Sequence, residues 1–253
     1  MMQHIELKIN LEFPGKNGSF IVHIWGKGPT PLEIIDPLEI RKADIQILKN
    51  YYLKNFNKQI ILLNQVHGNT VINADRLSLV SDALCSEGDA LITSNNENVL
   101  LVRTADCVPV LIFCERHEIW SAVHAGWRGL QKKIVSQAVK EMMTKTADSD
   151  LVKNLQFIIG PHIYSDSYEV GKEVYENFSP NHSYFQESRD EKKLLDLKAI
   201  LTEELTALGA EKKQVFIIQE DSFKNKNYFS HRNSEYGRNI NIIFYKKFND
   251  ILK

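Results

Sequence analysis

The sequence predicts a mixed α/β (α+β) fold in which helices flank a mixed central sheet. Short runs rich in Val, Ile and Leu, bounded by Gly, Asn and Asp, are typical of strands, and segments of helical periodicity are interleaved with them. Their order departs from strict strand–helix–strand alternation, which disfavours a doubly wound parallel sheet. Because no linker or repeat interrupts the chain, residues 1–253 are expected to form a single domain.

The individual elements follow from apolar periodicity. Strands are expected at 1–13, 60–63, 71–74, 90–93, 99–104, 108–113, 120–123, 155–159, 215–219 and 240–245. Helices are expected at 41–56, 130–145, 170–178 and 197–208. The helix at 130–145 has the clearest apolar stripe, and Gly209 is a natural stop for the last helix.

Composition and charge exclude several classes of protein. Hydrophobic residues make up 43% of the chain and charged residues 25%, as in an ordinary globular protein. A formal net charge of -1 supplies no field that would attract nucleic acid or anionic lipid, so neither is an expected partner. No apolar run approaches the roughly 18 residues of a membrane span, and the alternating N-terminus does not resemble a signal peptide.

The three cysteines favour a reducing compartment, because an odd, small number does not build a disulfide framework. A cytoplasmic location is therefore expected. Cys114 ends an apolar run and is expected to be a buried structural thiol. Cys85 lies in a polar loop and is expected to be incidental.

Three segments place a reactive side chain at the end of a predicted strand, where loops carry function on a rigid frame. His67 follows the strand at 60–63, Cys107 lies just before the strand at 108–113, and His124 ends the strand at 120–123. Pro109 suggests an edge or strand-start position for the second segment. Each residue also has an ordinary explanation: a hydrogen-bonded loop histidine, a buried structural cysteine and a histidine in a tight strand-to-helix turn.

Together His67, Cys107 and His124 are a ligand set for a catalytic zinc with one open position. Imidazole and thiolate also suit copper, so the ligand types leave the ion undecided. Cys107 with His124 would equally serve a thiol hydrolase in which the histidine activates the thiolate. Since the residues come from separate segments, their spacing leaves both chemistries open.

Arginines near these segments are candidates for binding an anion. The N–H groups at the start of the helix after Gly129 favour an anion, and Arg128 adds a fixed positive charge there. Arg232 and Arg238 are weaker candidates for phosphate or carboxylate, or else an ordinary surface pair.

Two acids and one further histidine complete the candidates. Asp89 precedes a strand and Asp106 precedes Cys107, so either could contact substrate or shuttle a proton. His162 could act as an acid, a base or a ligand, although a surface-loop position is favoured for it.

Several motifs occur in the order found in one known family: Asn-Gln-Val-His-Gly at 64–68, Gly-Asp-Ala at 88–90, Thr-Ala-Asp-Cys-Val-Pro-Val at 104–110, Val-His-Ala-Gly-Trp-Arg-Gly at 123–129, Gly-Pro-His-Ile at 160–163 and Tyr-Glu-Val-Gly at 168–171. The chain thereby resembles the laccase-domain family. That family was formerly called multicopper polyphenol oxidase and is now usually described as purine nucleoside phosphorylase and adenosine deaminase. Some bacterial members are described as peptidoglycan editing factors.

The resemblance implies a single α/β domain with a mixed sheet and a zinc ion held by His67, Cys107 and His124. It implies action on adenosine, inosine, guanosine or methylthioadenosine, with nucleoside and phosphate as small-molecule partners. Arg128 with the helix start is then the best candidate for phosphate. Asp89 and Asp106 are the candidate proton shuttles for deamination.

Two other activities and one non-catalytic role remain as alternatives. Copper electron transfer needs several metal centres, and only three of the eight histidines lie in the motifs, which disfavours a polyphenol oxidase. A Cys-His amide hydrolase that edits a peptidoglycan precursor is the second alternative. A binding protein with a structural metal is the third, although a structural zinc would need a fourth protein ligand.

The N-terminal third departs from the family pattern. Trp25-Gly26-Lys27-Gly28 stands roughly where relatives carry Arg-x-Gly-Gly, and the usual acidic and Asn-Arg segments are not recognisable between 29 and 59. Near the C-terminus, Glu220-Asp221-Ser222 replaces a common Cys-Thr pair. The predicted metal ligands lie outside these departures.

Overall fold

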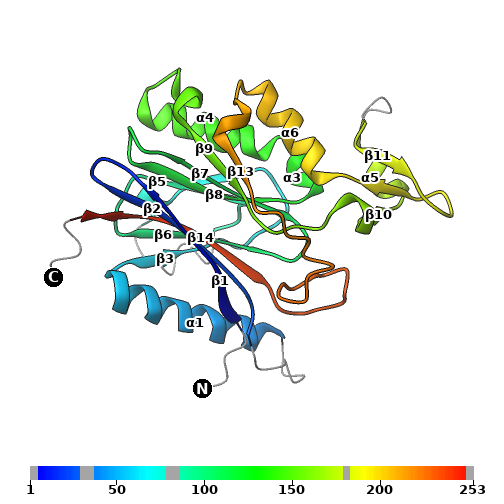
Figure 1. The fold of residues 1–253 in the computed structure, drawn as a ribbon, viewed down its shortest axis with the longest axis horizontal. Coiled ribbons are helices and arrows are strands. Elements are labelled where there is room, and N and C mark those ends of the chain that lie inside the picture. The colour runs from blue at the N-terminus through cyan, green and yellow to red at the C-terminus, as the bar shows by residue number, and fades with distance from the viewer. Residues whose placement is uncertain (1–4, 29–36, 78–85, 179–182, 249–253) are drawn as a thin grey trace.

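The computed structural model describes residues 5–28, 37–77, 86–178 and 183–248. They form layers: helix α1, a five-stranded sheet, a six-stranded sheet, and a helical layer with α4 and α6 (Figure 1). The expected mixed α/β class with flanking helices is confirmed. The strands, however, divide between two stacked sheets where one central sheet was expected.

The five-stranded sheet has the order β1-β2-β14-β6-β3, formed by β1 (Ile5–Pro14), β2 (Gly18–Lys27), β14 (Asn239–Lys247), β6 (Asn98–Thr104) and β3 (Gln59–Ile61). Neighbouring strands are antiparallel except β3, which runs parallel to β6. Helix α1 (Pro37–Phe56) covers the outer face of this sheet, and its Leu48 and Tyr52 are fully buried there.

The six-stranded sheet has the order β13-β9-β7-β8-β5-β4, formed by β13 (Val215–Ile217), β9 (Gln156–Ile159), β7 (Val108–Cys114), β8 (Ile119–Ala125), β5 (Ala90–Thr93) and β4 (Val71–Asn73). Its interior strand β7 is antiparallel to both neighbours. Helices α4 (Ile134–Thr146) and α6 (Leu197–Ala207) pack on its outer face through residues such as Val135, Val139 and Leu201.

Strand β2 shows how the layers are built. Phe20, Val22 and Ile24 face the core between the two sheets, whereas Ile21 and Trp25 face helix α1. A strand covered on both faces lacks the polar–apolar alternation of a half-exposed strand. No strand was predicted at 18–27 from the sequence, so β2 is an addition from the structure.

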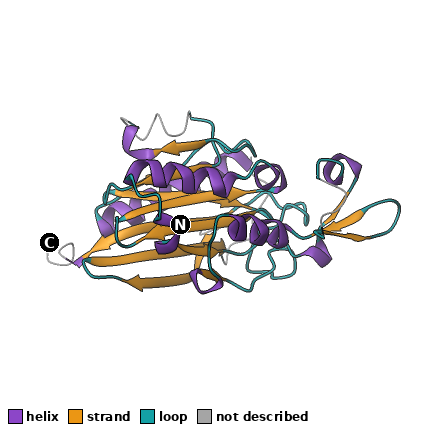
Figure 2. Cartoon of the chain, turned by 90° about the horizontal axis from the view of Figure 1, so that it is seen from above, coloured by secondary structure: helices purple, strands orange, loops and turns teal. Residues whose placement is uncertain are grey.

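Two helix predictions need correction. The helix expected at 130–145 is interrupted: α3 (Trp127–Gln131) ends before Lys133, which has a left-handed backbone (φ 59°), and α4 follows. The helix expected at 170–178 is instead the short strand β10 (Glu169–Val170) followed by α5 (Lys172–Tyr175). Strand β10 joins β12 (Lys193–Leu195) and β11 (Phe185–Glu187) in a small sheet that projects from the main body in both views (Figures 1 and 2).

One of the two cysteines outside the cluster lies within the described residues. Cys114 is fully buried, as expected, and Cys85 lies outside the described residues. Within the ranges that the structure describes, no helix combines the length and apolarity required to cross a bilayer.

The chain crosses from one sheet to the other at the end of β6. Residues 105–107 make this crossing, and β7 begins directly afterwards. The register of β7 and β8 pairs Val108 with Ala125 and Pro109 with His124. The crossing therefore brings Cys107 to the end of β8, and Pro109 occupies the start of an interior strand.

Candidate metal centre and its pocket

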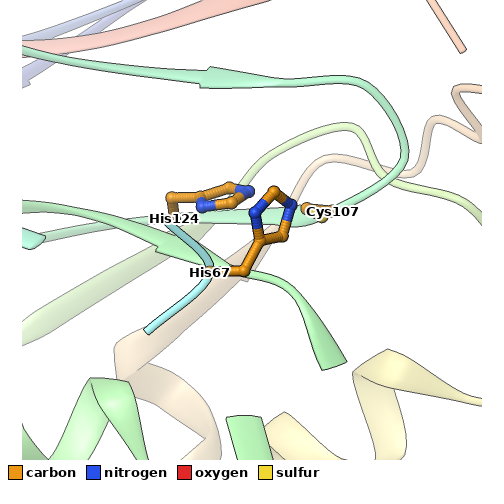
Figure 3. Close-up of side chains that lie close together, drawn as sticks. All are labelled: His67, Cys107 and His124. Atoms are coloured by element: carbon orange, nitrogen blue, oxygen red, sulfur yellow. The ribbon is translucent and has the colours of Figure 1, made fainter. Parts of the chain in front are cut away.

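His67, Cys107 and His124 lie together although they are far apart in the sequence. Their ligand atoms all lie within 4.8 Å of one another. Figure 3 shows the three side chains pointing toward a common point, with each residue carried by a different segment. The two imidazole rings are nearly perpendicular, at 81°, with centroids 4.7 Å apart. The geometry therefore permits one metal ion to contact all three.

Glycine is required where these segments meet. A Cβ atom on Gly126 would lie 3.0 Å from the Cys107 sulfur and 3.2 Å from Cδ2 of His67. Contacts this short would displace one of the two side chains. The Gly residue after β8 thus allows the backbone to pass close behind the cluster.

The side chain of Asp89 forms hydrogen bonds with two of the three segments that carry the cluster. Its buried carboxylate accepts hydrogen bonds from Nδ1 of His124 (2.8 Å) and from the backbone N–H groups of His67 (3.0 Å), Gly68 (2.6 Å) and Val66 (3.3 Å). His67 itself has a left-handed backbone (φ 60°), which is uncommon for a residue other than glycine. The carboxylate therefore holds the His67 turn in place and fixes the orientation of His124.

This position corrects one prediction for Asp89. It is fully buried and does not line the pocket, whereas a substrate contact was expected for it. Burial opposes the charge on Asp89, but the hydrogen bonds from His124 and Gly68 outweigh that effect and hold its pKa below the ordinary value. Asp89 therefore acts on the site through His124 and His67.

The electrostatics of the cluster favour a thiolate beside a charged imidazole when no metal is bound. Burial opposes ionisation of Cys107, but the neighbouring His124 and His67 outweigh it and lower the pKa of the thiol. Burial likewise opposes charge on His124, yet the Cys107 sulfur and Asp89 raise its pKa. Burial raises the pKa of Cys114, so Cys107 ionises more readily than Cys114 does.

The donor set fits a catalytic metal ion. Two imidazoles and a thiolate are donors that zinc and copper both accept. The hydrogen bond from Nδ1 to Asp89 leaves Nε2 of His124 for coordination, as in a carboxylate–histidine–metal arrangement. Among the residues that the structure describes, no fourth His, Cys, Asp or Glu joins the cluster. Three protein donors leave a position for water or substrate.

A cavity of about 690 Å³ opens beside the cluster, and we call it the site pocket. Several of its lining residues were predicted, and others were not. The predicted ones are His67, Cys107, His124, Arg128, Arg232, Arg238 and Asp106, and the unpredicted ones include Gln65, Arg103, Trp127, Tyr168 and His231. Four arginines against one acid give the site pocket a strongly cationic lining.

No helix begins directly after Gly129, where the sequence predicted a helix start that favours an anion. The helix at this point begins at Trp127, so Arg128 lies within the short α3 rather than before a longer helix. The next helix, α4, has its first turn occupied, because Ser136 donates its backbone N–H to the carboxylate of Glu204 (2.7 Å). The arginine side chains that line the site pocket are therefore the main candidates for holding an anion there.

The other two sequence candidates have structural partners. His162 is 1% exposed and donates from Nδ1 to the carbonyl of Gly160 (2.8 Å), so the expected surface-loop position is wrong. The carboxylate of Asp106 accepts hydrogen bonds from the Ser222 hydroxyl (2.9 Å) and the Arg232 backbone N–H (2.7 Å). Asp106 thus ties the crossing beside Cys107 to the C-terminal loop.

Gln65 shows what sequence reasoning missed. Its side-chain amide pairs with the backbone of Arg103, donating to the carbonyl and accepting from the N–H, each at 2.8 Å. This pairing joins the His67 loop to the end of β6. Its position two residues before His67 was a signal that it shares the same face, but its partner could not be read from the sequence.

The chain is similar to a laccase-like family and to relatives named purine nucleoside phosphorylase and adenosine deaminase. The family model for multi-copper polyphenol oxidoreductase laccase matches residues 36–246. A purine nucleoside phosphorylase of Rickettsia prowazekii is 34% identical over 199 residues, which are 77% of this chain and 77% of that protein. An adenosine deaminase from an unknown prokaryotic organism is 40% identical over 94 residues, 37% of this chain and 35% of that protein.

The solved structures extend the similarity to the fold. The hypothetical protein YfiH of Bacillus licheniformis has a TM-score of 0.74 at 20% identity, covering 89% of this chain and 92% of that one. YlmD of Geobacillus stearothermophilus has a TM-score of 0.72 at 20% identity, covering 92% and 98%. At this identity the likeness establishes the fold alone.

Proposed function

The chain belongs to the multi-copper polyphenol oxidoreductase laccase family, and on that premise we propose that it is a zinc-dependent enzyme of purine nucleosides. The proposed reactions are phosphorolysis of adenosine, inosine, guanosine or methylthioadenosine, and deamination of adenosine. The observation that carries this proposal is the convergence of His67, Cys107 and His124 beside a cationic pocket. Relatives named purine nucleoside phosphorylase and adenosine deaminase support the substrate class.

The proposed metal site consists of His67, Cys107 and His124. Zinc bound there would supply a Lewis acid with one open position toward substrate. Copper accepts the same donors, so metal analysis decides the ion. The described residues contain one such cluster, which favours a single metal ion over the several copper centres of an oxidase.

Deamination requires that a water oxygen bond to the purine C6 while the C6–N bond breaks and ammonia leaves with an added proton. The chain's own contribution is to hold the purine beside the cluster and to provide donors. Burial raises the pKa of Tyr168, so its hydroxyl stays protonated and can donate a hydrogen bond in the site pocket. Asp89 orients His124 rather than shuttling this proton, because its oxygens already accept four hydrogen bonds.

Phosphorolysis requires that a phosphate oxygen bond to C1′ of the ribose as the C1′–N9 bond breaks. The electron pair leaves with the purine, which then takes up a proton. Phosphate must be held next to the sugar, and guanidinium groups suit this task because they pair with phosphate oxygens in a fork. Arg128 and Arg232 line the site pocket and are the proposed holders.

The test begins with protein purified without added metal. We expect near-stoichiometric zinc in the unaltered protein, loss of zinc in Cys107→Ala, and retention of zinc in the control Cys114→Ala. Incubation with adenosine should release ammonia without phosphate and free adenine with phosphate. Release of neither product would refute the purine assignment.

A thiol hydrolase is the second candidate, and one observation favours it. Cys107, His124 and Asp89 form a nucleophile, a base and an orienting acid in hydrogen-bonded order. In that case metal-free protein would hydrolyse an amide in a peptidoglycan precursor, and alkylation of Cys107 would abolish the reaction. A requirement for zinc would exclude this candidate.

The location that we propose is the cytoplasm. Its support is the small number of cysteines, two of which, Cys107 and Cys114, are free thiols. Cell fractionation with an antibody to the chain would test it.

A further inference from the structure

We infer that Arg128 and Arg232 form a clamp for the phosphate group of a phosphate ester, a nucleoside monophosphate, at the mouth of the site pocket. This inference rests on the proposed function, because it places the nucleoside beside the metal ligands. The clamp is defined by these two arginines and the two aromatic rings on which they lie. It adds a second ligand, a phosphorylated nucleoside, to the two arginines that the proposed phosphorolysis assigns to inorganic phosphate, and the two ligands would compete for them.

The two guanidinium groups are held by aromatic rings. Arg128 lies over the Trp127 ring at 4.1 Å from its centroid, and Arg232 lies over the Tyr168 ring at 5.1 Å. Stacking fixes the plane of a guanidinium while its N–H groups at the edge stay available. For the described part of the chain, neither guanidinium has a carboxylate or carbonyl acceptor.

The other two arginines of the pocket differ. Arg238 directs one nitrogen at the carbonyls of Tyr236 (3.0 Å) and Gly237 (2.7 Å). Arg103 donates to the carbonyl of Leu63 (3.3 Å). Since these two arginines already donate to backbone carbonyls, Arg128 and Arg232 have more N–H groups available for an anionic ligand.

The backbone of Arg232 is fixed relative to the metal ligands. Its N–H donates to Asp106 (2.7 Å), and Asp106 immediately precedes Cys107. Asp106 has a positive φ of 87°, a conformation stabilised by its hydrogen bonds to Ser222 and Arg232. A phosphate group in the clamp would therefore stand at a set distance from a purine beside Cys107.

A second cavity explains why we infer an ester rather than inorganic phosphate alone. This side chamber, of about 420 Å³, shares Trp127, Arg128, Tyr168 and Arg232 with the site pocket. The clamp therefore forms a boundary between two cavities, and a phosphate group there has room for a substituent. A site for inorganic phosphate alone would not need space on both sides.

The charges of the side chamber point to the same ligand. Lys192 pairs with Glu169 at 3.0 Å, and that carboxylate also accepts the Ser188 hydroxyl at 2.7 Å. Lys192 and Glu169 offset each other, and Glu173 adds one further acid to the side chamber, so the positive charge at the boundary between the two cavities comes from Arg128 and Arg232. Two cations favour a dianion, and a phosphate monoester carries close to two charges at neutral pH.

The experiment measures binding to the metal-loaded protein by calorimetry. The three ligands are adenosine, adenosine 5′-monophosphate and inorganic phosphate. We expect the monophosphate to bind roughly tenfold tighter than adenosine, since a charge-assisted hydrogen bond contributes about this much. Arg128→Gln and Arg232→Gln should each remove most of that gain in affinity for the monophosphate.

Arg189→Gln is the matched control, because Arg189 is exposed in the turn between β11 and β12 and lies outside both cavities. Arg232→Lys separates charge from geometry, and it should recover part of the affinity. Thermal unfolding of each variant identifies any loss of folding, in which case Arg232→Lys carries the test.

Three results overturn the inference: equal affinity for adenosine and its monophosphate, no effect of either glutamine variant, or tight binding of inorganic phosphate with no gain for the ester. The proposed function fails separately. If adenosine is not turned over but the monophosphate still binds through both arginines, the clamp stands and the reaction assignment does not.

Discussion

Replacing Asp89 by asparagine tests whether one buried carboxylate organises the metal site. All four of its partners are nitrogen donors: three backbone N–H groups and Nδ1 of His124. An asparagine offers one acceptor oxygen, and its amide nitrogen would face two N–H groups. The substitution keeps the size of the side chain, so the effect reports hydrogen bonding and charge.

The magnitude follows from the bonds that are lost. Hydrogen bonds to a charged group contribute about 1.5–3 kcal/mol each, and donors left facing a donor in a buried site add to the loss. We expect the free energy of unfolding of metal-free protein to fall by about 3 kcal/mol. Loss of the carboxylate behind a metal-binding histidine should also weaken metal affinity by roughly 10- to 100-fold.

Urea unfolding of the metal-free protein measures the stability, and competition with a chelator measures the metal affinity. The control is Asp75→Asn, because Asp75 accepts hydrogen bonds from Ser94 and pairs with Lys145 at 2.8 Å, and none of these three residues lines the site pocket. The control should lower stability and leave metal affinity unchanged. An Asp89→Asn protein with unchanged metal affinity would refute the organising role.

Three further predictions concern the core of the site and of the sheet. Gly126→Ala places a Cβ 3.0 Å from the Cys107 sulfur, so metal affinity measured by chelator competition should fall; unchanged affinity would mean that the backbone shifts freely. Burial lowers the pKa of His23 to about 4 from 6.5, so the unfolded state takes up a proton at higher pH than the folded state does. The free energy of unfolding should therefore fall by about 3 kcal/mol as the pH drops from 6.5 to 4. Urea unfolding of the protein and of a His23→Gln variant checks this, and the same pH dependence of stability in both would contradict it. In metal-free protein at pH 7, iodoacetamide should alkylate Cys107 faster than Cys114, since the pKa of Cys107 is lowered and that of Cys114 is raised. Mass spectrometry of the two cysteine peptides measures both rates, and faster alkylation of Cys114 would contradict the prediction.

The three residues of the cluster could be predicted from the sequence because reactive side chains at strand ends, next to small residues, are typical of functional sites. His67, Cys107 and His124 each had that setting, and the order of the surrounding motifs pointed to one family. What the sequence could not supply was convergence. The approach of Cys107 to His124 depends on the register of β7 and β8 and on a chain crossing between two sheets.

The errors have a common physical cause, which is tertiary context. Periodicity predicted one helix across Lys133, because a single left-handed residue does not disturb an apolar stripe. His162 follows Gly-Pro, a pair typical of surface turns, yet the segment is buried beside Asp221. Asp89 was a candidate substrate contact or proton shuttle because it precedes a strand, and only the hydrogen bonds show that it faces inward.

The two site carboxylates should respond differently to the same substitution. The partners of Asp106 are a backbone N–H and the Ser222 hydroxyl, and a hydroxyl can accept as well as donate. Asparagine at this position can therefore accept from Arg232 through its oxygen and donate to Ser222 through its nitrogen. Asparagine also tolerates the positive φ of 87° better than most residues do.

Asp106→Asn should consequently cost less than about 1 kcal/mol of stability, against about 3 kcal/mol for Asp89→Asn. Asp106→Ala removes both hydrogen bonds and should weaken monophosphate binding by releasing Arg232, with metal affinity changed less than in Asp89→Asn. Paired urea and calorimetric measurements on the three variants test this order. Equal losses in the two asparagine variants would show that charge, rather than the donor pattern around each carboxylate, determines its role.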